Sequence, residues 1–175
     1  MLASDGTCHT QATTGPAPPC ISMCAATALD HETLVLFGGS DKNQAMSDTV
    51  YTLSTKTWQW RKLVSRGKTT PTARSSACMV SVDDESTCLV FGGAGIGADG
   101  YAGGKGLRGF DETWLLKVNE EFADWTALEH SDTLPPPRVA ASLNKFPRES
   151  GKFLLTGGWN PTTAETFEEP WAIEL

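Results

Sequence analysis

Cysteine and histidine are the residues of this chain most able to bind a metal or attack a substrate, and it holds five of the first and three of the second. Zinc sites built from these residues need two ligand pairs at short spacing. Cys20 and Cys24, with Cys8 and His9, form one group, and no second pair accompanies it. We therefore expect reduced structural cysteines, no metal site, and no Ser–His–Asp or Cys–His nucleophile.

Glycines between residues 94 and 111 form a second pattern with known chemistry. Gly95, Gly97 and Gly100 fit the spacing G-x-G-x-x-G directly after an apolar run. A dinucleotide binds this motif when a helix begins there and its amides face the pyrophosphate. Residues 101–106 include further glycines, which disfavour a helix. The segment therefore predicts an inserted loop and no nucleotide cofactor, and the loop is either functional or disordered.

Charge and hydropathy exclude several classes of partner. The formal net charge is −7 and the sequence pI is about 4.9. An acidic chain without a basic block is a poor ligand for nucleic acid or an anionic membrane. No stretch reaches the roughly 18 apolar residues that cross a bilayer, and the first residues lack the pattern of a signal peptide. These features predict a cytoplasmic protein with neither a membrane nor a nucleic-acid partner.

The elements that position any site are set by an internal repeat. Apolar runs end in a double glycine three times, at 34–39, 88–93 and 153–158, with the first glycines 54 and 65 positions apart. Arg74 and Arg138 each follow a proline by three positions ahead of the second and third copies. A tryptophan with leucine three positions later follows the first two copies. Such a period indicates stacked supersecondary units.

These marks together resemble the kelch repeat, whose second strand ends in a double glycine and whose fourth strand carries a tryptophan. The residues that carry the resemblance are Gly38, Gly39, Gly92, Gly93, Gly157, Gly158, Trp60 and Trp125. The resemblance implies an all-β fold built from propeller blades of four antiparallel strands, about three of them in an incomplete ring.

The residue types also suit such blades. Inner strands converge on an axis, and the segments 23–28, 75–79 and 139–142 carry mostly small side chains. The second strands are apolar throughout, as expected when both faces are buried. A glycine pair permits a positive φ and a close approach to the next blade. The two tryptophans are expected to fill the wider outer gap.

The repeat marks divide the chain into four parts. We expect an N-terminal segment at 1–17 as a candidate closing strand, and a first repeat at 18–70. A second repeat covers 71–134 and includes the glycine-rich insertion at 94–111. A third, truncated repeat covers 135–175.

Three blades do not close a ring, so we expect one of three arrangements. The chain is a fragment of a longer propeller, or it packs its open faces in another way, or it forms a homodimer. In the homodimer, residues 4–14 of one chain complete the third blade of the other.

The resemblance implies that partners dock on the face that carries the loops between second and third strands. The residues expected to bind a partner are Arg66, Arg74, Tyr101, Lys105, Arg108, Arg138, Trp159 and Asn160. The two arginines that begin inner strands are expected to point toward the channel mouth. The sequence thus predicts a protein–protein interaction scaffold, and the alternative is a propeller that binds or processes a small ligand or sugar.

Catalysis receives no support from the residues. Some kelch propellers are enzymes, among them copper radical oxidases and a sialic acid epimerase. The oxidases need tyrosine, cysteine and histidine ligands. Tyr51 and Tyr101 are the only tyrosines of this chain, and no matched histidine pair accompanies them. We therefore predict that the chain is not an enzyme.

Overall fold

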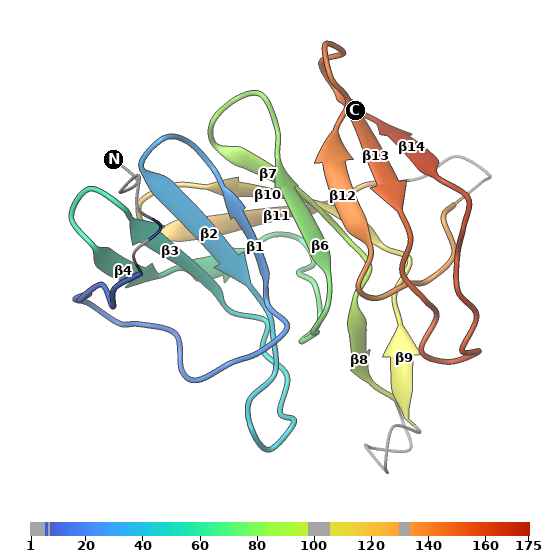
Figure 1. The fold of residues 1–175 in the computed structure, drawn as a ribbon, viewed down its shortest axis with the longest axis horizontal. Helices are drawn as coiled ribbons and strands as arrows, with labels where there is room; N and C mark the ends of the chain where they lie inside the picture. Colours follow the sequence, from blue (N-terminus) through green and yellow to red (C-terminus); the bar gives the residue numbers. More distant parts are fainter. Residues whose placement is uncertain (1–5, 7, 98–105, 130–133) are drawn as a thin grey trace.

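The computed structural model describes residues 6, 8–97, 106–129 and 134–175. These residues form strands and turns without a helix, so none of them belongs to a helix able to span a membrane. Three mainly antiparallel sheets stand side by side as propeller blades, with a small hairpin at the lower edge (Figure 1). The all-β prediction and the partial propeller are confirmed.

The first blade contains four strands in chain order: β1 (Ala25–Ala28), β2 (Thr33–Phe37), β3 (Val50–Ser54) and β4 (Gln59–Lys62). Polar turns of four residues join β1 to β2 and β3 to β4, whereas the longer loop 38–49 joins β2 to β3. The Asp30 carboxylate, for example, accepts a hydrogen bond of 2.7 Å from the Glu32 amide within the β1–β2 turn.

The second blade contains β6 (Cys78–Ser81), β7 (Thr87–Phe91), β10 (Thr113–Val118) and β11 (Phe122–Ala127). A fifth strand, β5 (Val64–Arg66), pairs with β11 in parallel and covers the outer edge. Every residue of β7 is buried, because this strand lies between two neighbouring blades.

The third blade contains β12 (Ser142–Lys145), β13 (Lys152–Thr156) and β14 (Trp171–Glu174). Among the described residues, β14 pairs with β13 alone. The glycine-rich insertion is not a loop throughout, because its two ends pair as a hairpin of β8 (Ala94–Ile96) and β9 (Leu107–Gly109). Its middle, 98–105, lies outside the described residues.

The apolar core divides into two layers, one on each side of the second blade. Between the first and second blades, Phe37 packs on Trp125 with ring centroids 4.8 Å apart, and Trp114 meets Trp125 edge-on at 6.2 Å. Between the second and third blades, Phe91 packs in a cluster with Phe153. Trp125 is 3% exposed, so it fills the outer gap as its position predicts. Trp60 lies in β4 and is half-buried.

The segment before the first blade lies on that blade's own outer strand. Thr14 bridges Gln59 in parallel, donating its amide to the Trp58 carbonyl at 2.9 Å and accepting from the Trp60 amide at 2.8 Å. This place on β4 is equivalent to the place of β5 on β11. In each of these two blades, the segment that precedes the blade therefore pairs with its outer strand. This pairing covers a sheet edge whose backbone groups would otherwise be exposed.

The glycine pairs stand where one blade meets the next. Gly39 donates its amide to the Arg74 carbonyl at 2.9 Å, and Gly93 donates to the Arg138 carbonyl at 3.0 Å. Both first and second glycines have φ between 65° and 97° in all three copies. A β-carbon on Gly92 would lie 2.7 Å from the Arg138 carbonyl oxygen. The expected close approach to the neighbouring blade is therefore confirmed.

Two alanine substitutions separate backbone strain from this interblade contact. Gly92 and Gly157 have φ of 67° and 65°, so each substitution carries the same left-handed penalty of about 1–2 kcal/mol. No described atom lies within 4 Å of a β-carbon on Gly157. We expect Gly92→Ala to lower the free energy of unfolding by about 2 kcal/mol more than Gly157→Ala, measured by urea unfolding. Equal losses of unfolding free energy would show that the contact with the Arg138 carbonyl adds nothing to the cost of alanine at position 92.

Candidate functional site

Equivalent residues of three blades converge at the mouth of the partial channel. Met23, Ser76 and Ala140 stand just before the inner strands with φ of 56°, 56° and 53°. The residue after each glycine pair forms an antiparallel bridge with the residue just before these positions. The bridges are Ser22–Ser40, Ser75–Ala94 and Val139–Trp159. The repeated backbone geometry thus places the same positions of each blade around one opening.

A hollow of about 280 Å³ lies between these positions. Its apolar lining includes Met23, Met46, Leu107 and Trp159, and its polar lining consists of serines and Gln44. Met23 is 57% exposed and Trp159 is 40% exposed. Large exposed apolar side chains gathered in a concave site are typical of partner-binding surfaces. We call this hollow the mouth.

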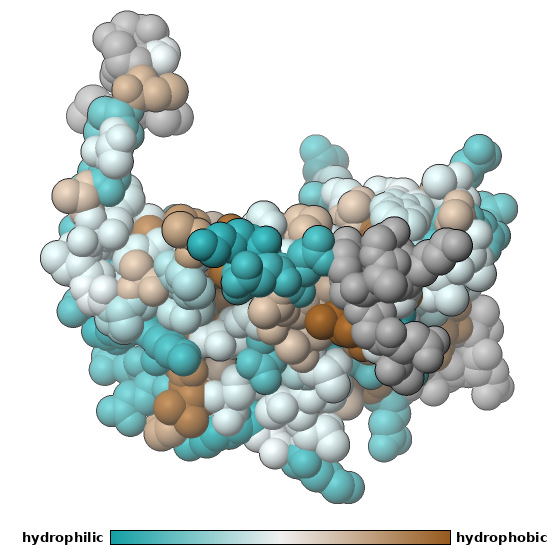
Figure 2. All heavy atoms as spheres, turned by 90° about the horizontal axis from the view of Figure 1, so that it is seen from below, coloured by the Kyte–Doolittle hydropathy of each residue, from teal (hydrophilic) through white to brown (hydrophobic). Residues whose placement is uncertain are grey.

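The face that carries the mouth is seen from below in Figure 2, where apolar patches lie among polar and neutral ones. A neighbouring hollow of about 330 Å³ shares Met46 with the mouth and is lined also by Ile96, Arg108 and Phe110. The Arg108 guanidinium lies 6.0 Å from the centre of the Phe110 ring. The positive charge of Arg108 therefore lies beside the mouth, whose described lining is uncharged.

Arg74 was expected to point toward the channel mouth, but its side chain is buried and does not line the mouth. Its side chain is 0% exposed and donates to the Gly92 carbonyl at 3.1 Å and to the Glu112 carboxylate at 2.7 Å. The guanidinium lies 4.2 Å from the centre of the Phe110 ring. Burial lowers the pKa of Arg74, and Glu112 opposes that shift through its hydrogen bond and charge. The arginine joins the second and third strands of its blade.

Arg138 repeats this arrangement in the third blade, and it too is buried and absent from the lining of the mouth. It is 1% exposed, donates to the Gly157 carbonyl at 3.0 Å and lies 4.1 Å from the centre of the Phe167 ring. Burial lowers its pKa. Among the described residues, no carboxylate takes the place of Glu112 here, and the Nη2 atom of Arg138 has no partner.

The other predicted contact residues divide between two places. Trp159 lines the mouth and Arg108 lines the neighbouring hollow. Asn160 has a structural role, because its side-chain oxygen accepts the Thr162 amide at 2.9 Å and holds a turn. Tyr101 and Lys105 lie outside the described residues. Met23 and Met46 were not predicted to line a site. Both are apolar residues in loops that precede or follow strands of the repeat, and this pattern could have identified them.

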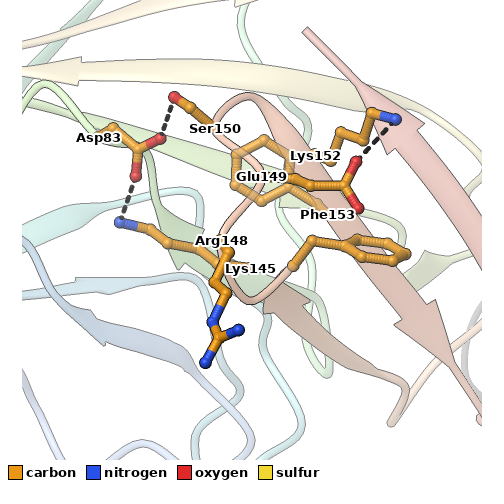
Figure 3. Close-up of a pocket in the computed structure, with 8 residues that line it drawn as sticks. Asp83, Lys145, Arg148, Glu149, Ser150, Lys152 and Phe153 are labelled. Carbon is orange, nitrogen blue, oxygen red and sulfur yellow. Dashed lines mark hydrogen bonds and ion pairs between the residues drawn. The ribbon is translucent and has the colours of Figure 1, made fainter.

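A second cleft lies on the opposite face, between the β6–β7 turn and the β12–β13 turn (Figure 3). Asp83 accepts the Ser150 hydroxyl at 2.6 Å and pairs with Lys145 at 3.1 Å, which lower the pKa of Asp83. Glu149 pairs with Lys152 at 2.9 Å and raises its pKa. The contacts of Asp83 with Lys145 and Ser150 join two blades and occupy these polar groups, so the cleft is a weaker candidate than the mouth.

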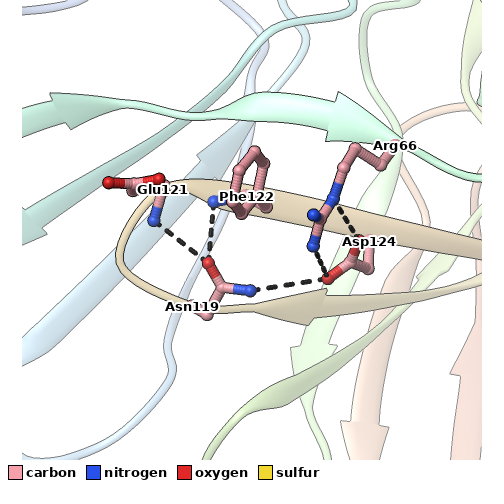
Figure 4. Close-up of polar contacts among 5 residues, drawn as sticks. All are labelled: Arg66, Asn119, Glu121, Phe122 and Asp124. Carbon is pink, nitrogen blue, oxygen red and sulfur yellow. Dashed lines mark hydrogen bonds and ion pairs between the residues drawn. The ribbon is translucent and has the colours of Figure 1, made fainter.

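Arg66, which was expected on the docking face, lies on the outer edge of the second blade (Figure 4). It donates two hydrogen bonds to the Asp124 carboxylate, at 2.8 and 2.9 Å, and lies 3.5 Å from the centre of the Phe122 ring. Asn119 holds the adjoining turn by accepting the Phe122 amide at 2.8 Å. Arg66 thus fastens β5 to β11, and it is absent from the lining of the mouth.

The cysteines remain unpaired, and their surroundings differ. Cys8 and Cys20 are exposed, whereas Cys88 is buried in the core. Burial raises the pKa of the Cys78 and Cys88 thiols to about 12. A thiol with so high a pKa is a poor nucleophile near neutral pH. Within the described ranges, no three His, Cys, Asp or Glu side chains gather as a metal site.

Comparison with known proteins gives one family and several similar folds. A family model described as the KLHDC2/KLHL20/DRC7 Kelch-repeats domain matches residues 3–174. No curated protein matches the chain. The solved "Structure of YjhT" is 21% identical, with a TM-score of 0.56 over 82% of this chain and 36% of that one.

A chain of the "Cryo-EM structure of RAG in complex with one melted RSS and one unmelted RSS" is 16% identical, with a TM-score of 0.65. The match covers 93% of this chain and 53% of that chain. This chain therefore spans about one third and one half of the two solved chains. Likeness at such identities shows a shared fold.

Replacement of Arg74 tests its structural role. Arg74→Met keeps much of the apolar stem but leaves the Gly92 carbonyl and Glu112 without their donor. We expect a loss of about 3 kcal/mol in the free energy of unfolding, measured by urea unfolding. Arg108→Met is the matched control, since that side chain is exposed and its loss should change stability by at most about 0.5 kcal/mol. Equal effects of the two substitutions would refute the structural role.

Proposed function

Because the chain belongs to the kelch-repeat family, we propose that it is a protein-interaction scaffold whose mouth holds a side chain of a partner protein. The observation that carries the proposal is the exposure of Met23 and Trp159 in a concave site formed by three blades. Tryptophan supplies a large contact area, and methionine adapts to varied shapes. These properties suit recognition of an apolar anchor.

The composition of the mouth favours a protein partner over a sugar or a charged small molecule. Among the described residues, its lining combines apolar side chains with serine and glutamine and contains no charged residue. A site for a sugar gains affinity from several convergent hydrogen-bonding groups, whereas burial of an apolar anchor needs few. The same neutral lining favours binding over acid–base catalysis.

The proposal also includes the cellular setting and the wider assembly. Five cysteines without a disulfide are the usual state of a reducing compartment, which favours the cytoplasm. A homodimer, or a longer propeller to which these blades belong, remains compatible with a mouth formed by three blades. In either case the lining residues named above supply one side of the opening.

Substitutions at the mouth test the proposal. Trp159→Ala and Met23→Ser remove exposed apolar area without touching the core, so we expect normal unfolding and about tenfold weaker partner capture. The measurement is quantitative affinity capture followed by mass spectrometry, with wild-type and variant chains compared for each captured protein.

Val64→Ser is the matched control, because Val64 is 59% exposed but lies in β5 on the outer edge. The Val64→Ser variant should capture the same partner proteins at the wild-type level. If all captured proteins bind the mouth variants and the wild type alike, the mouth is not the docking site.

A further inference from the structure

The methionines of this chain differ in how far an oxidant can reach them. Peroxides convert an accessible thioether to a sulfoxide, which is polar and chiral. Of the four methionines, Met23 and Met46 line the mouth, Met79 lies in the core between the first and second blades, and Met1 lies outside the described residues. Met23 is 57% exposed and Met46 is half-buried, whereas Met79 is 7% exposed. The structure therefore predicts oxidation of the described methionines in that order.

The backbone holds both mouth methionines in place whatever the state of their sulfur atoms. Met23 has a φ of 56°, and its carbonyl accepts the Ser76 amide of the second blade at 2.8 Å. Met46 forms an antiparallel backbone bridge with Ser40. Neither backbone contact involves the thioether. An oxygen added to either sulfur therefore changes the surface of the mouth and leaves the blades in position.

A sulfoxide in the mouth would oppose the binding of an apolar anchor. In the free chain, its oxygen can accept a hydrogen bond from water or from polar lining groups such as the Ser76 hydroxyl and the Gln44 amide. An apolar anchor would displace the water and offer no donor in return, so the buried oxygen would lose hydrogen bonds. Oxidation also removes the flexible apolar thioether that adapts to the shape of a partner. The free chain thus tolerates the oxidation, and the complex does not.

The cysteines also react with peroxides, but none of them lines the mouth. Cys8 and Cys20 carry exposed thiols, and burial raises the pKa of the Cys78 and Cys88 thiols to about 12. The first oxidation products of cysteine are reversed by thiols, whereas a methionine sulfoxide needs a dedicated reductase. Thiol treatment therefore separates oxidation of cysteine from oxidation of methionine.

We propose that Met23 is a reversible oxidation site that controls partner binding at the mouth, with Met46 as a second, slower site. The inference rests on the function proposed above for the mouth. The Met23 sulfur attacks one oxygen of a hydroperoxide and the O–O bond breaks. The sulfur gains that oxygen and loses two electrons, while the peroxide is reduced to water or an alcohol. A methionine sulfoxide reductase reverses the step, because two thiols take up the oxygen as water and become a disulfide.

A peptide that binds the mouth is the probe for this proposal. It is selected by panning a phage-displayed library of random peptides on the full chain, and it is retained only if Trp159→Ala weakens its binding. The full chain is then treated with hydrogen peroxide followed by dithiothreitol, which restores oxidised thiols and leaves sulfoxides. Mass spectrometry of proteolytic fragments gives the extent of oxidation at each methionine.

We expect Met23 to be oxidised before Met46, and Met79 to stay reduced while the chain is folded. In an anisotropy titration, the labelled peptide should bind the oxidised chain about tenfold more weakly, since the anchor loses an apolar contact. Treatment with methionine sulfoxide reductases of both stereospecificities should restore the affinity. Urea unfolding should be the same before and after oxidation, which separates lost binding from lost structure.

Met23→Leu retains an apolar side chain of similar volume and has no sulfur. This variant should bind the peptide like the wild type and lose most of its sensitivity to peroxide. Met79→Leu is the matched control, because it removes a methionine that the oxidant does not reach, and its peptide binding should respond to peroxide as the wild type does.

Unchanged peptide binding after oxidation of Met23 would overturn the regulatory role and leave the proposed function of the mouth intact. An equal loss of binding in the oxidised wild type and the oxidised Met23→Leu variant would overturn the assignment to Met23. Failure to select any peptide that depends on Trp159 would overturn the function of the mouth, and this inference with it.

Discussion

The structure depends on a hydrogen-bond relay that runs through one arginine per blade junction. The Arg74 carbonyl accepts the Gly39 amide of the first blade, and its guanidinium donates to the Gly92 carbonyl of the second. Arg138 does the same between Gly93 and Gly157. A single residue thus binds the glycine pairs of two blades, one with its backbone and one with its side chain. The close approach requires glycine, because a β-carbon would meet the arginine carbonyl.

This relay explains why the mouth has a regular lining. It fixes the start of the second and third inner strands against the end of the preceding blade's second strand, so Ser76 and Ala140 occupy equivalent places. The residue that follows each glycine pair is then free to vary without loss of the fold. Serine, alanine and tryptophan stand there in the three blades, and the third provides the exposed ring of the mouth. Recognition thus uses positions that the framework leaves unconstrained.

The blades are alike in framework but not in their surfaces. The second blade is buried on both faces, and its arginine has a carboxylate partner in Glu112. The third blade has mostly exposed residues in β12 and an arginine whose Nη2 atom has no partner among the described residues. Its stability therefore relies more on the apolar layer shared with the second blade, in which Phe153 and Leu155 are fully buried.

Local sequence pattern determined much of the fold. Apolar runs ending in glycine pairs marked the buried second strands, and a tryptophan at fixed spacing marked the fourth, because both depend on residues within one repeat. The parallel strand β5 and the hairpin β8–β9 were not predicted, since their pairing partners come from a different blade link or from the far end of an insertion. The same limit affected the site. From the sequence, Arg74 and Arg138 were expected to be exposed charges, because arginine at the start of a strand usually faces water. Only the tertiary structure buried them, by bringing the rings of Phe110 and Phe167 and the carbonyls of distant glycines around each guanidinium.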